Sequence, residues 1–277
     1  MSGYPHKLTM LAPHLQTELP GTLHLGALRL PVFALFATAG LVVALLFSER
    51  TAERVGLSAQ KLWDAGVAAV VAAFVISRVQ LVAENFTTFK IFPALVLGLP
   101  SITQLGVFLT AIFALIWLRF RRVPLLSALD AWAPCVALLT AFLDLGHFFE
   151  RTEAGMPTKL PWGVTSAGDT VLGHTHPVQL YGFALATLLA AAAWTQLGRS
   201  KAGGVAAFSL FTGGVGSFLL SFLRQPTLQV SGLPLDAAQA LSALMALAGV
   251  ALFATISPIQ PGSRVARDVP AERFDHA

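Results

Sequence analysis

The sequence predicts an all-α membrane protein of about seven transmembrane helices with a proline-rich periplasmic loop. Of its 277 residues, 55% are hydrophobic and only 12% are charged, which is about half the charged fraction of an ordinary soluble domain. The mean hydropathy is +0.71. A soluble protein with a large core would not contain several uninterrupted apolar runs of about 20 residues, the length that crosses a bilayer. The composition therefore excludes a soluble globular protein.

Seven apolar runs are long enough to cross, or nearly cross, a hydrocarbon core of about 30 Å. Inside lipid the backbone polar groups must be satisfied within the segment, so each run is predicted to be a helix. The predicted spans are Leu30–Phe47, Leu62–Phe86, Leu97–Leu118, Val123–Phe149, Val178–Leu197, Val205–Leu223 and Ala237–Ile256.

The lysines and arginines between the spans predict the orientation, because short cytoplasmic loops carry the excess of these residues. Alternate connections divide them eleven to six. The N-terminus is therefore predicted to lie outside a bacterial inner (plasma) membrane and the C-terminus in the cytoplasm. The predicted cytoplasmic set is Arg50, Arg54, Lys61, Arg119, Arg121, Arg122, Arg199, Lys201, Arg264, Arg267 and Arg273, and the external set is Lys7, Arg29, Lys90, Arg151, Lys159 and Arg224.

The chain is predicted to divide into an external N-terminal arm (1–29), a membrane domain (30–256) and a cytoplasmic tail (257–277). The arm is polar and lacks the apolar core of a cleavable signal peptide. The longest connection in the membrane domain, residues 150–177, is external and carries two prolines between Met156 and Gly163. We expect a folded loop there, with Trp162 anchored at the membrane interface.

Several classes of function are disfavoured by composition. The net charge is +4, but the basic residues are spread over short loops without a basic face, so we expect no nucleic-acid partner. Cys135 is the only cysteine, which excludes an intrachain disulfide and a zinc cysteine cluster. His174 and His176 with Asp169 could ligate a metal, although such spacing arises readily by chance. We expect neither a metal nor a cofactor.

Ionisable residues within the predicted spans converge on their outer half. Arg78 lies about 12 Å below the outer end of the second span, and Arg224 ends the sixth. Asp144 and His147 share one face at the outer end of the fourth span, and His176 begins the fifth. Two arginines can hold a phosphodiester, and a histidine beside a carboxylate can act as a general base. This combination predicts an outer-leaflet phospholipid as substrate.

Structural roles remain open for the same residues. Arg224 and His176 could be interfacial anchors, and Asp144 with His147 could only cap the helix end. Arg78 could pair with a carboxylate such as Glu84. Two other acids are expected to have structural roles only. Glu150 is expected to be solvated, and Asp130, in the inner half, is expected to hydrogen-bond another helix.

Six motifs occur in order along the chain. They are Ser77-Arg78, Asp130 to Pro134 followed by Gly146 and Phe148, Gly155 to Trp162, His176 to Tyr181, Phe222 to Pro226, and Gln239 to Ser242. Together they resemble the G-R, D-x-x-A-P…G-N-F, G-x-P-T-x-L-P-W, H-P-x-Q-L-Y, F-x-R-Q-P and Q-x-L-S motifs of the prolipoprotein diacylglyceryl transferase family. The resemblance covers roughly Leu30 to Ile256.

The resemblance implies a seven-helix enzyme that moves diacylglyceryl from phosphatidylglycerol to the lipobox cysteine of a prolipoprotein. It implies that substrate-binding residues are Arg78, Arg224, His176, Gln179 and Tyr181. The chain departs from the family at other positions. The resemblance places the family's catalytic histidine near Thr103-Gln104, its essential arginine at Asp144 and its G-N-F asparagine at His147. It places the N-G-E glutamate at Thr152 and the first-helix tyrosine at Phe33. An arginine and a glutamate of the family's sixth helix correspond to Ser217 and Ser221.

Two hypotheses follow from these departures. The first is a divergent phospholipid-dependent diacylglyceryl transferase in which His147 is the replacement base and Asp144 orients it. The second is a non-catalytic relative that binds phospholipid or lipoprotein on the same scaffold. Retention of Arg78, the His176 to Tyr181 motif and Arg224 favours the first, and the replaced histidine and arginine favour the second.

Overall fold

The fold is a bundle of membrane-length helices, seen in a computed structural model that describes residues 22–25, 28–91, 103–150, 155–165, 174–225 and 236–256. Within those ranges six helices are long and apolar enough to cross a membrane, and α4 is a shorter apolar helix. The predicted all-α membrane class is confirmed. The helices are α1 (Val32–Arg54), α2 (Ala59–Glu84), α3 (Phe86–Ile91), α4 (Gln104–Phe120), α5 (Leu125–Glu150), α6 (Val178–Gln196), α7 (Gly204–Ser221) and α8 (Ala237–Ile256).

The helix bounds differ from the predicted spans at several ends. Helix α1 continues past the predicted end at Phe47, because two polar side chains are satisfied within the helix itself. The Ser48 hydroxyl donates to the Leu45 carbonyl at 2.6 Å, and the Thr51 hydroxyl donates to the Ser48 carbonyl at 2.9 Å. Helix α4 begins at Gln104, and residues 97–102 of the predicted third span lie outside the described residues. The short helix α3 was not predicted.

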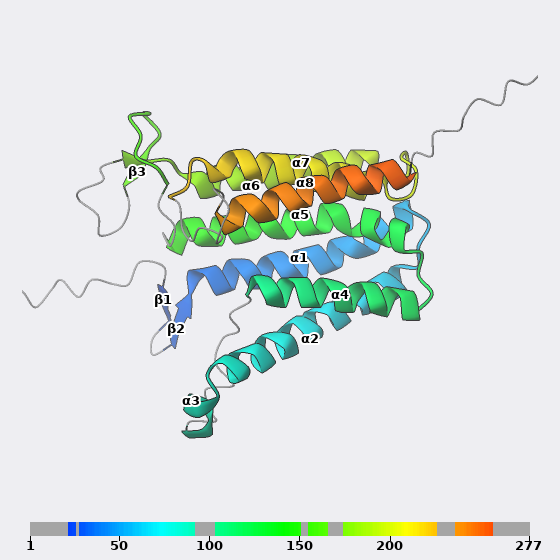
Figure 1. The fold of residues 1–277 in the computed structure, drawn as a ribbon, viewed down its shortest axis with the longest axis horizontal. Helices are drawn as coiled ribbons and strands as arrows, with labels where there is room; N and C mark the ends of the chain where they lie inside the picture. Colours follow the sequence, from blue (N-terminus) through cyan, green and yellow to red (C-terminus); the bar gives the residue numbers. More distant parts are fainter. Residues whose placement is uncertain are drawn as a thin grey trace, which may run out of the picture.

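Helix α5 is the central helix of the bundle and packs against α1, α6 and α7. Helix α8 packs on α7, where Gly214 and Gly249 allow the two backbones to approach closely: a Cβ at Gly214 would lie 2.5 Å from the Ala246 amide nitrogen. Small residues allow such contacts between membrane helices. Helix α2 pairs with α4 and α1 and tilts away from the other helices toward its C-terminal end (Figure 1).

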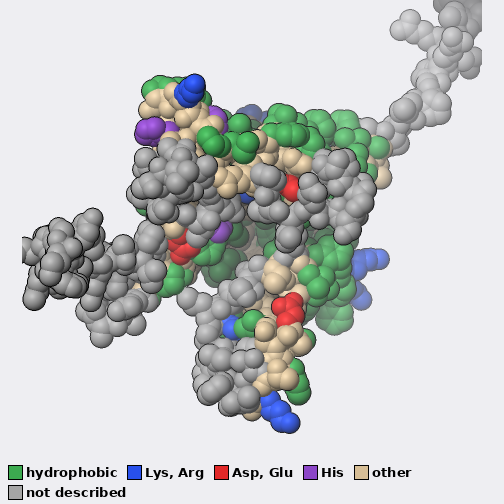
Figure 2. Space-filling view, turned by 60° about the vertical axis from the view of Figure 1, so that its left-hand side comes forward, with side chains coloured by type: hydrophobic (Ala, Val, Ile, Leu, Met, Phe, Trp, Pro, Cys, Tyr) green, Lys and Arg blue, Asp and Glu red, His purple; other side chains and the backbone are tan. Residues whose placement is uncertain are grey.

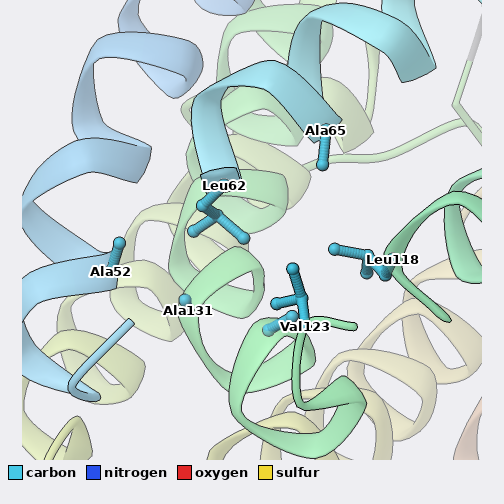
Figure 3. Close-up of a cluster of buried hydrophobic side chains, with 7 residues drawn as sticks. Ala52, Leu62, Ala65, Leu118, Val123 and Ala131 are labelled. Carbon is cyan, nitrogen blue, oxygen red and sulfur yellow. The ribbon is translucent and has the colours of Figure 1, made fainter. Parts of the chain in front are cut away.

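A hydrophobic cluster joins α1, α2, α4 and α5 near the turns that connect them (Figure 3). Leu62 and Leu118 are fully buried there and meet Val123 in the turn between α4 and α5. Elsewhere the lateral faces expose large apolar side chains, and Figure 2 shows hydrophobic side chains gathered along the top and the right-hand side of the view. Exposed apolar faces of this extent are expected where a helix meets lipid rather than water.

The bundle has two chemically different ends. The turns α1–α2, α4–α5 and α6–α7 lie together at what we name the basic end, which carries Arg50, Arg54, Lys61, Arg119, Arg121, Arg122, Arg199 and Lys201. The opposite end, named the loop end, carries the antiparallel hairpin β1 (Thr22–Leu25)–β2 (Leu28–Pro31), α3, and the antiparallel pair β3 (Val164–Thr165)–β4 (His174–Thr175) (Figure 1). These strands were not predicted. The division matches the two loop sets that the sequence separates.

Asp130 joins α5 to the start of α7. Its side chain is 3% exposed, and its two oxygens accept the Gly203 amide at 2.6 Å and the Ala206 amide at 2.8 Å. Gly203 adopts a left-handed backbone with φ of 88°, a conformation that favours glycine. The expectation that Asp130 hydrogen-bonds another helix is confirmed. The carboxylate also complements the positive end of the α7 dipole.

Replacing Asp130 with alanine should lower stability by about 1–3 kcal/mol, because buried amides at the start of α7 lose their acceptors. Asp130→Asn, which keeps one acceptor oxygen, should lose less. The control is Asp64→Ala, a partly exposed carboxylate that lies 3.8 Å from Arg121 and accepts from Gln60 Nε2 at 2.8 Å, and its loss should change stability by under about 0.5 kcal/mol. Unfolding in mixed micelles, followed by circular dichroism, measures the difference. Equal stability of the two alanine variants would contradict the assigned role.

The grouping of basic side chains predicts which end faces the cytoplasm. Reporter fusions at Arg121 and Ser200, both at the basic end, should give cytoplasmic signals. A fusion at Lys159, in the loop end, should give an external signal. A cytoplasmic signal at Lys159 would reverse the orientation assigned to the bundle.

Candidate functional site

A cavity of about 430 Å³ lies between α5, α6, α7 and α8, within the usual size range of small-molecule sites. Most of its wall is apolar and includes Leu129, Leu185, Leu189 and Met245. Polar side chains form the remainder. They are Thr140, Asp144, Ser209, Ser217, Ser221, Arg224 and Ser242.

The cavity is elongated along the bundle. Its lining on α5 extends from Leu129 to Asp144, which corresponds to about 22 Å of helix. Asp144 lies near the end of α5, and Arg224 follows the end of α7. The two charged side chains are therefore at the loop end of a long, mainly apolar cavity.

A glycine on α6 makes room for the Asp144 carboxylate. A Cβ at Gly182 would lie 2.5 Å from Asp144 Oδ2. At that distance any side chain at position 182 would force the carboxylate or the helix to move. The absence of a side chain at Gly182 therefore allows α6 to pack directly against the acid. Sequence reasoning singled out Asp144 but missed this glycine, which lies one residue beyond the His176 to Tyr181 motif.

Arg224 is held by the external loop through its backbone. Gly155 forms an isolated antiparallel bridge with Arg224, and the Met156 amide donates to the Leu223 carbonyl at 2.8 Å. On the other edge of the same segment, the His176 amide donates to the Met156 carbonyl at 3.0 Å. Residues 155–156 thus join the residues before α6 to those after α7.

Gly155 is required by this arrangement. A Cβ at that position would collide with the backbone carbonyl of His176. The next pairing, between the Thr158 amide and the His174 carbonyl at 2.8 Å, continues the same ladder. The prediction of a folded loop between α5 and α6 is confirmed for residues 155–165.

Three of the predicted binding residues lie at the start of α6, beside this loop. The Tyr181 hydroxyl accepts a hydrogen bond from Trp162 Nε1 at 2.7 Å and lies 3.4 Å from His176 Nδ1. Since Tyr181 accepts from Trp162, its own proton can be donated to the imidazole. Gln179 is 4% exposed. Trp162 therefore has a defined partner in addition to the interfacial position predicted for it.

His147 lies on the side of α5 that faces α1. Its ring packs on Phe33 with centroids 4.5 Å apart and an interplanar angle of 37°. One turn later, Glu150 Oε1 accepts the Phe33 amide at 3.2 Å. The expectation that Glu150 is merely solvated is wrong, because the free amides at the start of α1 require an acceptor.

Arg78 is on α2, where it is 7% exposed and its guanidinium lies 5.2 Å from the centre of the Phe74 ring. Neither Arg78 nor His147 is among the described residues that line the cavity. The structure thus brings Asp144 and Arg224 to one cavity. It places His147 against α1, Arg78 on α2, and His176 with Tyr181 beside the loop.

Thr103, near which the resemblance predicts the family's catalytic histidine, has a structural role here. Thr103 precedes α4, and its hydroxyl oxygen accepts the Gly106 amide at 3.0 Å. The same hydroxyl donates to Gln80 Oε1 on α2 at 2.9 Å. This residue therefore caps α4 and ties it to α2.

Serines on α7 and α8 complete the cavity. Ser217 and Ser221 are four residues apart on one face of α7, a spacing that could have identified them as a pair from the sequence. Ser242 on α8 also lines the cavity. The nearby Gln239 instead caps α8, since its amide donates to Asp236 Oδ1 at 2.7 Å and its side chain accepts the Asp236 amide at 3.2 Å.

These features define a multi-pass helical membrane protein with an apolar cavity whose loop end is charged. The prolipoprotein diacylglyceryl transferase family profile matches residues 20–255, and the chain belongs to that family. Similar proteins include the phosphatidylglycerol–prolipoprotein diacylglyceryl transferases of three bacteria. Identity is 31% for Mycolicibacterium paratuberculosis (57% of this chain, 38% of that protein), 30% for Nocardia farcinica (84% and 52%) and 26% for Corynebacterium glutamicum (74% and 72%). The matched segment is about two fifths of the Mycolicibacterium paratuberculosis protein and half of the Nocardia farcinica protein.

Gly155→Ala should loosen the external loop, because the added methyl group displaces Met156 from His176. Overpacking of this kind costs about 1–3 kcal/mol, so trypsin should cut after the exposed Lys159 about tenfold faster. Gly204→Ala, at the basic end, should leave the cleavage rate unchanged. An unchanged rate in Gly155→Ala would show that the ladder does not hold the loop.

Proposed function

We propose that the chain is a divergent phosphatidylglycerol–prolipoprotein diacylglyceryl transferase that acts in lipoprotein biosynthesis. Family membership and the names of the relatives support this activity. The observation that carries it is the long apolar cavity with Asp144 and Arg224 at one end. Such a cavity suits a ligand with acyl chains and a charged head group.

The proposed substrates are an outer-leaflet phospholipid, named as phosphatidylglycerol in the relatives, and the lipobox cysteine of a prolipoprotein. The cysteine sulfur would form a bond to the glyceryl carbon as that carbon's bond to the phosphate oxygen breaks. The phosphate leaves with its remaining head group, and the thiol proton passes to a base. The atoms and charges of this transfer balance without a cofactor or a metal.

The residues divide between binding and proton transfer. Arg224 would bind the phosphate by charge-assisted hydrogen bonds. Arg78, the other arginine predicted to bind phosphate, is not among the described residues that line this cavity, so the proposed phosphate site rests on Arg224. His176, Gln179 and Tyr181 would bind substrate beside the external loop. That loop ties His176 to the backbone of Arg224 through residues 155–156, so substrate contacts at the two positions would be coupled.

His147 is proposed as the base and Asp144 as the residue that orients it. They are three residues apart on α5, a spacing at which neighbouring side chains can meet, although Asp144 faces Gly182 on α6 and His147 packs on Phe33 of α1. A substrate thiol would have to reach His147 at the interface of α5 and α1, where the imidazole packs on Phe33.

The proposed setting is a bacterial inner membrane with the loop end external. Residues 1–29 would form an external arm and residues 257–277 a cytoplasmic tail. The external position of the loop end gives the cavity's charged end access to outer-leaflet lipid and to exported lipoprotein.

A non-catalytic relative is the second candidate. The packing of His147 on Phe33, and the capping role of Thr103, near which the resemblance predicts the family's histidine, favour it. Such a protein would bind phospholipid or lipoprotein in the same cavity without turnover.

Purified protein in vesicles of mixed phosphatidylglycerol and phosphatidylethanolamine should add diacylglyceryl to a synthetic lipobox peptide, detected by mass spectrometry. His147→Gln should lower the rate about 10²–10⁴-fold, because the general base is lost, while the protein still accumulates in the membrane. The control is His174→Gln, an exposed loop histidine, which should retain the wild-type rate.

The outcomes separate the candidates. Full activity in His147→Gln would remove His147 as the base. Failure of that variant to accumulate would assign the residue a structural role at the α1 interface. A wild-type protein that binds lipid but never modifies the peptide would establish the non-catalytic alternative.

A further inference from the structure

We propose that Trp162 and Tyr181 are positioning residues that hold His176 as a hydrogen-bond donor to the substrate phosphate, with the donated proton on Nε2 of the ring. The inference rests on the proposed function, because it gives His176 one chemical role in the transfer described above. It is carried by a chain of two hydrogen bonds that joins the external loop to the start of α6.

The hydrogen-bond chain runs in one direction. Trp162 Nε1 can only donate, so the Tyr181 hydroxyl oxygen accepts at the 2.7 Å contact between them. The single proton of that hydroxyl is then directed to His176 Nδ1, which lies 3.4 Å away. If Nδ1 carried a proton instead, the Tyr181 oxygen would accept from two donors while its own proton lost this acceptor. The arrangement that satisfies all three side chains therefore leaves Nδ1 unprotonated.

An unprotonated Nδ1 decides what the other ring nitrogen of His176 can do. In a neutral imidazole one nitrogen is a donor and the other an acceptor, and the hydrogen bond made by one nitrogen sets the tautomer. Because Nδ1 accepts from Tyr181, Nε2 carries the proton. His176 can then donate to an anionic oxygen through Nε2, but it cannot take a thiol proton there. Tyr181 contributes through His176, and the base remains His147.

The external loop holds both ends of the hydrogen-bond chain in place. Two residues after Trp162, Val164 pairs with Thr175 in the β3–β4 ladder. The next residue is His176, whose amide donates to the Met156 carbonyl at 3.0 Å. The backbones beside Trp162 and His176 therefore belong to one small set of paired strands, which limits their movement relative to each other.

Trp162 is exposed and yet makes a directed hydrogen bond. Its side chain is 57% exposed, so burial contributes little to holding the indole where it is. An interfacial anchor could satisfy its N–H with water or a lipid head group. Here the N–H instead meets the Tyr181 hydroxyl at 2.7 Å. The hydrogen bond therefore explains the position of this indole better than packing does.

A phosphate oxygen is the acceptor that suits this donor. Residues 155–156 lie between His176 and the backbone of Arg224, so the two proposed phosphate donors flank one segment of the loop. Negative charge develops on the phosphate as its oxygen separates from the glyceryl carbon, and a donor already in position stabilises that charge. The 3.4 Å contact between Tyr181 and His176 is long, and hydrogen bonds of this kind often tighten when substrate binds.

The tautomer can be measured by ¹⁵N NMR on the full chain, labelled at histidine and reconstituted in lipid, with His176→Gln used to assign the His176 signals. Wild-type His176 should have a protonated Nε2 and an unprotonated Nδ1. Tyr181→Phe and Trp162→Phe should each shift His176 toward a mixture of tautomers, whereas Trp63→Phe, at the basic end, should leave it unchanged. Glycerol phosphate, which the proposed transfer releases from phosphatidylglycerol, should shift the Nε2 signal more than the Nδ1 signal.

Peptide transfer provides a second measurement. Trp162→Phe should lower kcat about two- to tenfold, the loss expected for one hydrogen bond, with little change in KM for phosphatidylglycerol. His176→Gln can keep an N–H near the position of Nε2 and should retain more than about a tenth of the wild-type rate. His176→Asn, whose shorter amide reaches only the position of Nδ1, should lose about 10²–10³-fold, as when a positioned donor is removed.

Wild-type His176 protonated at Nδ1 overturns the inference, and so does a tautomer that both Tyr181→Phe and Trp162→Phe leave unchanged. Because Trp162 is exposed, Trp162→Phe keeps this test decisive if Tyr181→Phe fails to accumulate. Equal loss of transfer in His176→Gln and His176→Asn would also overturn the donor role. The expected tautomer and glycerol phosphate response without any transfer defeat the catalytic proposal alone, whereas transfer by a protein with Nδ1 protonated defeats this inference alone.

Discussion

The hydrogen bonds from the start of α7 to Asp130 hold together the two helices on which the cavity depends. Asp130 lies near the start of α5, and both of its oxygens are used by α7 amides. In a lipid environment these amides have no water to replace a lost acceptor. Since α5 and α7 both run from the basic end to the loop end, this attachment fixes the position of α7 along the axis of the bundle, and with it the position at which α7 ends. It thereby places Arg224 at the same end of the cavity as Asp144.

Other helix starts are held by the same physical means. Glu150 accepts an amide of α1, Thr103 an amide of α4, and Asp236 an amide of α8. These contacts explain why a polar residue near a span end need not belong to the site. Glu150 lies six residues beyond Asp144 and holds α1, whereas Asp144 faces Gly182 and the cavity. Whether an acid near a span end caps a helix or lines a cavity depends on whether its side chain faces the first amides of a neighbouring helix.

Sequence reasoning could predict the helices because each long apolar run must hydrogen-bond internally in lipid. It could not predict that α1 continues to Arg54, since Ser48 and Thr51 end the apolar run but satisfy themselves within the helix. The two short strand pairs carry too few residues to show an alternating pattern. Charge within a span identified Asp144 and Arg224 as unusual. It did not reveal that the two residues share a cavity. Helix periodicity indicates which residues share a helix face, but it does not indicate which other helix packs against that face. Arg78 is not among the described residues that line the cavity.

The most direct test of the central claim, that this cavity holds the phospholipid head group, is photo-crosslinking with a phospholipid that carries a photoreactive group beside its phosphate. Labelled peptides identified by mass spectrometry should come from the end of α5 around Asp144 and the segment around Arg224. Excess unlabelled lipid should suppress this labelling, but it should not suppress labelling of the lipid-exposed face of α8 at Leu247 to the same extent. Saturable labelling around Arg78 on α2, with none around Asp144 and Arg224, would contradict the account.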